Sequence, residues 1–263
     1  MDPVIQVENV VKSFGPRRVL DEVNFSIEKG KILVILGMSG CGKSTLLKHL
    51  VGTLRPDSGE IWLLGQDISR MKQSDLDQLR KKIGILYQSA ALFNSMTVGG
   101  NVAFPLKEHT ALNDKIIQIM IRIKLELVGL SGFEDLMPAQ ISGGMKKRVG
   151  IARALALDPE LVFYDEPGAG LDPVTLAVID QLILDLSRKL GITSVVVTHE
   201  IQSAFRIADQ MVMMHGGKVI AEGSPDQIRS SSNPIVQQFI KGEAEGPIPM
   251  KRDSSEYLKS LAG

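Results

Sequence analysis

The sequence predicts an α/β fold with a core of mostly parallel sheet, an antiparallel β layer and an inserted α-helical lobe. Apolar runs of strand length alternate with helical patterns, as in parallel sheets whose strands are buried on both faces. Residues 4–27 instead alternate apolar and polar positions, which is typical of antiparallel strands with one exposed face. Strand-like runs then disappear from about residue 89 to residue 158, where helical patterns dominate.

The composition is that of a globular protein. The chain has 263 residues, of which 44% are hydrophobic and 23% charged, enough for one large domain or a domain with a lobe. Its 30 basic and 30 acidic residues cancel, which argues against a general nucleic-acid binder. The single cysteine, Cys41, excludes an internal disulfide framework and fits a reducing compartment. We see no signal-peptide pattern and no apolar run of the ~18 residues that a membrane span needs, so membrane association is expected through a partner.

The N-terminal half supplies the β layer, a central strand and two helices. Period-two alternation predicts two paired strands joined by the loop KSFGPR, and KILVILG predicts a central strand. GMSGCGKSTLLKHLVG turns from that strand into a helix. A turn with a β segment, a short helix and a further strand follow. In order, these elements span residues 4–11, 18–27, 31–37, 37–52, 55–68, 74–82 and 83–88.

The C-terminal half contains the lobe and completes the core. The expected helical segments are 96–106, 113–130, 142–157, 225–230 and 234–241, and the expected strands are 161–167 and 193–199. Another helix follows Pro173, since proline is favoured at the first helical position. Two β runs surround Gly216-Gly217, which is a hairpin signal. We expect one domain over residues 1–242, with its lobe at about 89–158, and a polar C-terminal extension over 243–263.

Residues 37–45, GMSGCGKST, fit the phosphate-binding pattern G-x-x-x-x-G-K-[ST], with a buried strand before it and a helix after it. Glycines let the backbone approach phosphate oxygens, and N–H groups and the helix dipole bind the anion. We expect Lys43 to reach the β- and γ-phosphates and the Ser44 hydroxyl to ligate Mg²⁺. A chance glycine loop is the alternative, and the flanking elements disfavour it. The candidate nucleotide-binding residues here are Gly37, Ser39, Gly40, Cys41, Gly42, Lys43, Ser44 and Thr45.

Two adjacent carboxylates follow the apolar strand LVFYD. Asp165 ends this strand, where it can hold Mg²⁺, and Glu166 points differently and can polarise an attacking water. Adjacent carboxylates at a strand end are costly because like charges repel and burial adds to the cost, which a bound cation offsets. The alternative is a surface turn before Pro167, and the apolar run disfavours it.

Two further polar residues end strands of the predicted core. Ligands of open α/β sheets gather at the carboxyl ends of the strands. We therefore expect His199 to contact the γ-phosphate and Gln88 to touch Mg²⁺ or water. A structural histidine is the competing interpretation for His199.

A second candidate anion site lies at ISGGMKKRVGIARAL, residues 141–155. It begins with a favoured helix N-cap and two glycines, followed by three cations in the first turns. The helix macrodipole disfavours cations there by roughly 0.3–1 kcal/mol each, so the cluster indicates an anion site. The sequence leaves open whether this stretch serves the nucleotide at Lys43 or another one. The residues concerned are Ser142, Gly143, Gly144, Lys146, Lys147 and Arg148.

Together these stretches resemble the ATP-binding-cassette (ABC) ATPases, over residues 4 to about 240 and in the order of that family. The phosphate loop matches Walker A, ISGGMKKR matches the signature, and LVFYDE matches Walker B. Gln88 matches the Q-loop residue, and His199 matches the switch histidine. AGLD, ending at Asp172, matches the D-loop, and Phe14 in KSFG matches the aromatic residue that stacks on adenine.

The resemblance implies a head-to-tail dimer that holds two ATP molecules with Mg²⁺. The signature helix of one subunit caps the ATP held by the other, so residues 142–144 would serve the neighbour's nucleotide. Glu166 is implied as the general base, with Lys43 and His199 stabilising the transferring phosphoryl group. Met145 stands where the signature usually has Gln, a departure that removes one side-chain hydrogen bond.

SAALFNSMTVGGNVAFPL, SGGMKKRVGIARALALDPEL and YDEPGAGLDPVT closely resemble ATPases of the Mla type, which work with MCE-domain proteins. This resemblance implies phospholipid transport between the inner and outer membranes of a Gram-negative envelope, maintaining outer-membrane lipid asymmetry, with the ATPase on the cytoplasmic face of the inner membrane. The implied partners are a second copy, a multi-spanning permease, a periplasmic MCE-domain protein and a small STAS-domain subunit, without nucleic acid. The extension 243–263 resembles one that docks on the neighbouring ATPase, whereas its composition alone favours a disordered tail.

Other assignments stay open at this point. One is the ATPase of an amino-acid importer or of a lipoprotein-release complex. Another is a soluble cassette ATPase that acts on DNA or ribosomes, although such proteins usually carry two cassettes or a long coiled-coil insert. For a transporter, the permease is expected in the groove between the lobe and the Gln88 strand, with Phe93, Met96 and Phe104 as apolar contacts. Simple core packing is the alternative for these three side chains.

Overall fold

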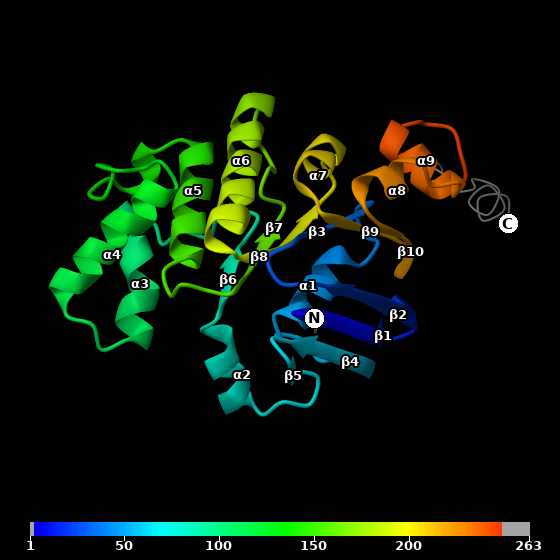
Figure 1. The fold of residues 1–263 in the computed structure, drawn as a ribbon, viewed down its shortest axis with the longest axis horizontal. Coiled ribbons are helices and arrows are strands. Elements are labelled where there is room, and N and C mark those ends of the chain that lie inside the picture. Colours follow the sequence, from blue (N-terminus) through cyan, green and yellow to red (C-terminus); the bar gives the residue numbers. More distant parts are fainter. Residues whose placement is uncertain (1–2, 249–263) are drawn as a thin grey trace, which may run out of the picture.

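A computed structural model describes residues 3–248, which form two sheets, a helical lobe and a set of C-terminal helices (Figure 1). The smaller sheet is antiparallel, with the order β2-β1-β4-β5. Its strands are β1 (Ile5–Phe14), β2 (Arg17–Ile27), β4 (Ser58–Leu63) and β5 (Gln66–Asp67). β1 and β2 continue through the segment that we expected to be a loop, because Gly15 at a φ of 57° allows a tight turn between the paired residues Phe14 and Arg17.

The larger sheet confirms the predicted parallel core. Its order is β10-β9-β3-β8-β7-β6, and only the edge strand β10 among these described strands runs antiparallel to its neighbour. Along β3, alternate residues such as Val34 and Ile35 enter two different core clusters, so this strand is buried on both faces. The strands are β3 (Ile32–Gly37), β6 (Ile83–Leu86), β7 (Leu161–Asp165), β8 (Thr193–Thr198), β9 (Gln210–His215) and β10 (Lys218–Gly223).

Helices outside the lobe pack around the larger sheet. They are α1 (Lys43–Leu50), α2 (Gln73–Arg80), α6 (Pro173–Leu190), α7 (Ile201–Ile207), α8 (Pro225–Arg229) and α9 (Pro234–Lys241). Pro173 begins α6, as its sequence position predicts. The seven-residue α7 was not predicted, because so short a helix shows no clear period. It follows β8 almost directly and therefore lies next to the strand end that carries His199.

The helical lobe is inserted between β6 and β7 and lies at the left of Figure 1. It comprises α3 (Val98–His109), α4 (Asp114–Leu127), a 3-10 helix (Pro138–Gln140) and α5 (Gly143–Ala154). Thr97 caps α3 and Asn113 caps α4, each accepting a hydrogen bond from a backbone N–H of the first turn. The lobe shares one apolar core cluster with α6 and one face of the larger sheet.

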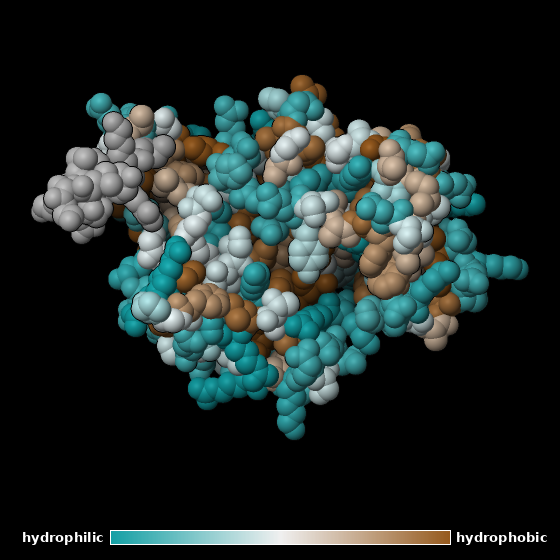
Figure 2. Space-filling model, turned by 180° about the vertical axis from the view of Figure 1, so that it is seen from behind, coloured by the Kyte–Doolittle hydropathy of each residue, from teal (hydrophilic) through white to brown (hydrophobic). Residues whose placement is uncertain are grey.

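The surface mixes polar and apolar regions. On the face opposite to that of Figure 1, hydrophobic side chains gather around a hollow near the middle, among mostly hydrophilic surroundings (Figure 2). The outer face of α4 exposes a row of isoleucines at helical spacing, Ile116, Ile119 and Ile123. Among residues 3–248, no helix is both long and apolar enough to cross a membrane.

Candidate nucleotide site

The phosphate loop joins β3 to α1 through residues 38–42. Gly42 has a φ of 111°, and a Cβ atom there would lie 2.8 Å from the carbonyl oxygen of Val19. A Cβ atom at Gly37 would lie 2.4 Å from the carbonyl oxygen of Met214, so both positions require glycine. No side chain in the described part of the chain caps α1. Its first N–H groups therefore remain available to an anion.

The loop forms one wall of a cavity of about 820 Å³, a volume typical of small-molecule sites. Most of the predicted nucleotide-binding residues line it: Phe14, Ser39, Gly40, Gly42, Lys43, Ser44, Thr45, Gln88, Glu166 and His199. Cys41 instead lies beneath the loop and is 7% exposed, and its burial raises the pKa of its thiol. Gly37 is likewise buried. These two residues support the conformation of the loop and do not line the cavity.

Several cavity-lining residues were not predicted. They are Arg17, Val19, Met38, Ile201 and Phe239. Met38 occupies a variable position of the phosphate-loop motif, and the other four belong to no recognisable motif. Ile201 and Phe239 come from α7 and α9, which only the folded chain brings to the phosphate loop.

Lys43 is folded back across its own loop. Its Nζ donates to the carbonyl oxygens of Gly37 and Met38, at 2.6 and 3.1 Å, and the residue is only 7% exposed. The ammonium is thus held beside the cavity by neutral acceptors. Phosphate oxygens can replace these acceptors, because their negative charge adds a Coulombic attraction to the ammonium that neutral carbonyls lack.

Glu166 and His199 meet at the ends of β7 and β8, as their strand-end positions predict. One carboxylate oxygen of Glu166, Oε2, lies 2.9 Å from His199 Nδ1 and accepts from the His199 backbone N–H at 3.3 Å. Glu166 has a φ of 47°, an uncommon left-handed conformation for a residue with a side chain. Its backbone N–H donates to the carbonyl oxygen of Val197 at 2.8 Å, which fixes the turn. The geometry therefore aims the carboxylate at His199.

Asp165 and its surroundings fit a Mg²⁺ ion. Burial, followed by the charge of Glu166, raises the pKa of the Asp165 carboxyl, while Lys147 and Lys43 lower it. Ser44, Gln88 and Asp165 supply hydroxyl, amide and carboxylate oxygens, the ligand types that Mg²⁺ prefers. Residues 3–248 contain no group of three or more His, Cys, Asp or Glu side chains that could hold a metal. The remaining ligands must come from phosphates and water, as is usual for Mg²⁺.

Gln88 lies two residues beyond the end of β6, which stops at Leu86, rather than at the strand end itself. It lines the nucleotide cavity and also a smaller one of about 580 Å³ that Asp165 shares. The extra two residues place Gln88 in a loop. The distance between the Gln88 side chain and the nucleotide therefore depends on the contacts that position this loop.

The signature segment, at the start of α5, has different surroundings from the phosphate loop at the start of α1. Ser142 caps α5, its hydroxyl accepting from the Met145 N–H at 3.2 Å. Gly143 is exposed, whereas Gly144 is buried with its Cα against α6, where a Cβ atom would lie 2.4 Å from Thr175 Cγ2. Of the described residues, none from this helix start is among those that line the nucleotide cavity. This helix start and that of α1 are therefore two separate sites.

The expected cationic cluster at the signature is wrong for two of its three members. Lys147 Nζ turns inward and donates to the carbonyl oxygens of Gln88 and Glu166, and burial lowers the pKa of this ammonium. Arg148 Nη1 donates to the carbonyl oxygens of Val128 and Gly129, at 3.2 and 3.1 Å. Both side chains satisfy backbone carbonyls of other segments, which outweighs the macrodipole cost. Of the three cations, Lys146 alone is left to serve an anion here, beside the backbone N–H groups and the Ser142 hydroxyl.

Asp172 lies apart from the cavity and caps α6. Its Oδ1 accepts from the backbone N–H groups of Val174 and Thr175, both at 3.0 Å. The Thr175 side chain and these N–H groups lower the pKa of the Asp172 carboxyl. The nucleotide contact expected for Asp172 remains a prediction.

The sequence of this chain is similar to one protein family and to several individual proteins. The profile of the protein family described as ABC transporter matches residues 20–169. The MlaF ATP-binding protein of the intermembrane phospholipid transport system of Haemophilus influenzae is 45% identical over 258 residues, covering 98% of each chain. A probable ribonucleotide transport ATP-binding protein, mkl of Mycobacterium leprae, is 42% identical over 97% of this chain and 74% of its own.

The fold is also similar to that of solved ATP-binding cassettes. The ATP-binding cassette MJ0796, solved as a dimer in a post-hydrolysis state bound to ADP and Pi, superposes with a TM-score of 0.77. It is 31% identical to this chain, covering 84% of it and 98% of the cassette. At that identity and coverage, the likeness extends to the arrangement of the whole cassette.

Proposed function

The chain belongs to the ABC transporter family, and we propose that this ATP-hydrolysing subunit drives phospholipid transport between two membranes. The observation that carries the ATPase role is the single cavity at which the phosphate loop, Glu166 and His199 converge. The cargo is supported by the 45% identity to the phospholipid transport ATPase of H. influenzae, which spans 98% of both chains. The mkl relative names ribonucleotides as an alternative cargo.

Nucleotide binding follows from the cavity walls. Phe14 is 51% exposed at the rim, so its ring can stack on adenine. The uncapped N-terminus of α1 receives the phosphates. Lys43 exchanges its two loop carbonyls for phosphate oxygens, and Mg²⁺, held by Ser44, Asp165 and Gln88, neutralises phosphate charge when bound.

Hydrolysis is the in-line attack of water on the γ-phosphorus. Glu166 accepts a proton from the water as the new P–O bond forms, and the bond to the bridging oxygen breaks to leave ADP and phosphate. His199, through its contact with Oε2, fixes the orientation of the Glu166 carboxylate. Lys43 stabilises the charge on the transferring group, which is usually the dominant contribution.

The working unit is a head-to-tail dimer with two ATP molecules at the interface. Ser142 and Gly143 are exposed, and they lie outside the cavity of their own chain within the described structure. A second copy brings this helix start to the γ-phosphate, so each nucleotide is contacted from both sides. The MJ0796 cassette, solved as a dimer, supports this arrangement.

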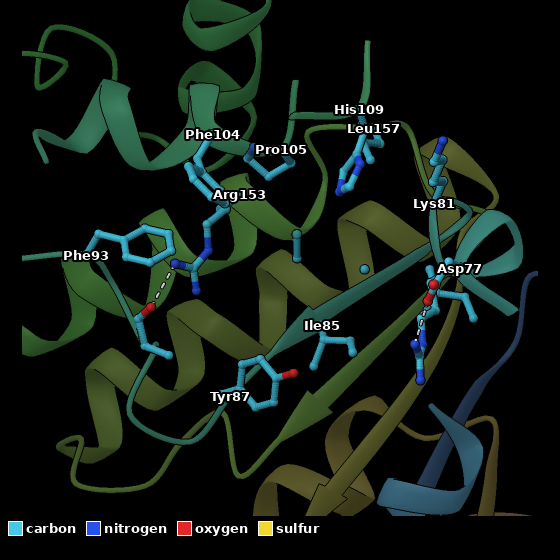
Figure 3. A pocket seen from close by; sticks show the side chains of 15 residues that line it. Asp77, Lys81, Ile85, Tyr87, Phe93, Phe104, Pro105, His109, Arg153 and Leu157 are labelled. Carbon is cyan, nitrogen blue, oxygen red and sulfur yellow. Dashed lines mark hydrogen bonds and ion pairs between the residues drawn. The ribbon is translucent and has the colours of Figure 1, made fainter. Parts of the chain in front are cut away.

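The permease is proposed to dock in the groove between the lobe and β6. This groove has a volume of about 700 Å³ and a mainly apolar lining in which Phe93, Phe104 and Tyr87 face a shared space (Figure 3). The rings of Phe93 and Phe104 lie 4.8 Å apart, and Arg153 lies 5.8 Å from the Phe93 ring centroid. Phe93 is 40% exposed, so core packing alone does not account for this side chain. Met96 is absent from the described lining of the groove, contrary to our expectation.

Further partners follow from the proposed transport system. A periplasmic MCE-domain lipid-binding protein would join through the permease, which places the ATPase on the cytoplasmic face of the inner membrane. The exposed isoleucine row of α4 is an unpartnered apolar surface that suits a small STAS-domain subunit.

The C-terminal extension is proposed to dock on the partner ATPase. Its first residues return to α9, where the Gln238 side chain accepts from the Ile248 N–H at 2.8 Å and donates to the Ile248 carbonyl at 3.3 Å. This contact fixes the point from which the extension leaves the domain. The rest of the predicted docking segment, 249–263, lies outside the described residues.

Recovery of the native complex from detergent-solubilised membranes tests the proposed cargo. With the full-length chain as bait, we expect a multi-spanning permease, an MCE-domain protein and phospholipid, identified by mass spectrometry. ATP turnover of the reconstituted complex should rise with phospholipid vesicles. Recovery of a nucleotide-binding, amino-acid-binding or lipoprotein-releasing partner set, without an MCE-domain protein, would contradict the lipid assignment.

A further inference from the structure

Lys147 is a buried lysine at an unusual junction. It is 5% exposed, and its Nζ donates to the carbonyl oxygen of Gln88 at 2.5 Å and to that of Glu166 at 3.1 Å. A buried ammonium costs several kcal/mol unless it is hydrogen-bonded and its charge is compensated. The two carbonyls, together with the nearby Asp165 and Glu166 charges, supply that compensation. A single side chain thus joins α5 to two loops of the nucleotide site.

The position of Lys147 on α5 links it to the signature. Gly143 and Lys147 are four residues apart, so they lie on the same face of the helix, one turn apart. Gly143 is exposed at the end of the helix, and Lys147 is buried below it. A displacement of the helix start is therefore carried directly to the Lys147 ammonium.

The same helix holds the rest of the Gln88 loop. Arg153 donates to the carbonyl oxygens of Ala90 and Ala91, both at 2.7 Å. Ala90 and Ala91 have φ values of 60° and 47°, a left-handed conformation that is strained for alanine and needs outside support. A Cβ atom at Gly150 would lie 2.6 Å from Leu86 Cδ1, so α5 and β6 pack without a gap. The loop must follow α5 when that helix moves.

We propose that Lys147 is a positioning residue that sets the backbone at Glu166 and Gln88 according to the position of the signature helix. Because Ser142 and Gly143 contact the neighbour's nucleotide, occupation of one site adjusts the general base and the Gln88 loop of the other. The inference rests on the head-to-tail dimer of the proposed function. Lys147 touches no substrate and acts only through the two carbonyls.

The test compares Lys147→Met with Lys124→Met in the full-length chain. Lys124 is a matched control, since it is 6% exposed in the same lobe but pairs with Asp158, away from the nucleotide site. Lys147→Met should lower kcat by roughly 10- to 100-fold, the scale of a small misplacement of catalytic groups. The KM for ATP should stay within about twofold, and the Hill coefficient for ATP should fall from about 2 toward about 1. Lys124→Met should keep the wild-type kcat, KM and Hill coefficient while lowering the unfolding temperature.

A nucleotide-free measurement supplements the kinetics. Amide hydrogen exchange at residues 87–91 and 165–168 should accelerate in Lys147→Met and stay at the wild-type rate in Lys124→Met. If Lys147→Met does not fold, Lys147→Gln, whose amide is shorter and uncharged, replaces it with the same expected directions. Unchanged kcat, Hill coefficient and exchange would overturn the role of Lys147 while leaving an ATP-dependent wild-type dimer intact. A wild-type chain that never dimerises with ATP would overturn the proposed function itself.

Discussion

The starts of α1 and α5 are both glycine-containing helix N-termini, yet they differ in the groups around them that could bind an anion. α1 begins without a side-chain cap from the described residues and opens into a cavity that also holds Lys43, Glu166 and His199. α5 is capped by Ser142, opens to the surface and turns Lys147 and Arg148 away from any anion. A phosphate needs charge compensation as well as N–H donors. The start of α1 is set among such groups within one chain, whereas we propose that the start of α5 completes a site only with another molecule.

The largest expected effect is at the α1 site. Glu166→Gln keeps the shape and the hydrogen-bonding capacity of the side chain but cannot accept the proton of the attacking water. Turnover should fall by ~10²–10⁴-fold while ATP binding persists. ATP-bound dimers should then accumulate, as seen by size-exclusion chromatography.

Glu8→Gln, on the exposed side of β1, is the control for this experiment and should hydrolyse ATP at the wild-type rate. If Glu166→Gln also hydrolyses ATP at an undiminished rate, Glu166 is not the base.

The second prediction separates the two signature glycines. A methyl group at Gly144 meets Thr175 Cγ2 at 2.4 Å, so Gly144→Ala should lose ~1–3 kcal/mol of unfolding free energy through overpacking. At Gly143 the nearest atom is Leu171 Cδ2 at 4.0 Å, so Gly143→Ala should fold at least as stably. Its methyl group should instead obstruct the neighbour's nucleotide and weaken ATP-dependent dimerisation.

Thermal unfolding and dimerisation, measured on both variants, check this pair. Equal behaviour of Gly143→Ala and Gly144→Ala in both measurements would show that the exposed and buried faces of the α5 start are not distinct.

The smallest expected effect concerns Asp165. Its folded-state pKa is raised, first by burial and then by Glu166. The resulting cost in folding free energy is absent below the ordinary pKa of the carboxyl, grows as the pH rises toward the raised pKa, and is complete above it. Asp165→Asn should therefore stabilise the nucleotide-free protein at pH 7 by ~0.5–2 kcal/mol. The gain should vanish as the pH falls below the pKa of the carboxyl. Scanning calorimetry at several pH values measures it, and a destabilised variant at pH 7 would refute the argument.

The stabilisation of Asp165→Asn by MgATP tests whether Asp165 is a Mg²⁺ ligand. MgATP should raise the unfolding temperature of the wild-type chain more than that of the variant, because the variant lacks a Mg²⁺ ligand. Equal stabilisation would separate Asp165 from the cation.

Sequence patterns predicted the parts of the molecule that rest on local chemistry. The phosphate loop, the buried strand before it and the strand-end carboxylates each carry a periodicity or a spacing with a physical cause, and the fold confirms those elements. The N-cap at Ser142 was also visible, since its hydroxyl acts within one helical turn.

What the sequence could not predict depends on contacts between distant segments. Nothing near Lys147 in the sequence indicates that its ammonium reaches carbonyls 59 and 19 residues away, so it was predicted to belong to an anion-binding cluster. Phe239 reaches the nucleotide cavity only because α9 packs there. The short α7 lacked a period, although it lies next to His199.

Mixed dimers test the central account most directly. Lys43→Ala removes the phosphate-loop ammonium, and Ser142→Arg blocks the α5 start, so each chain alone should be inactive. In a head-to-tail dimer of the two, one composite site is intact. An equal mixture should regain at most about a quarter of wild-type turnover, because about half of the dimers are mixed, each has one good site, and the coupling proposed through Lys147 lowers turnover beside a dead site. A mixture no more active than the two variants measured separately would contradict the claim that α5 serves a neighbour's nucleotide.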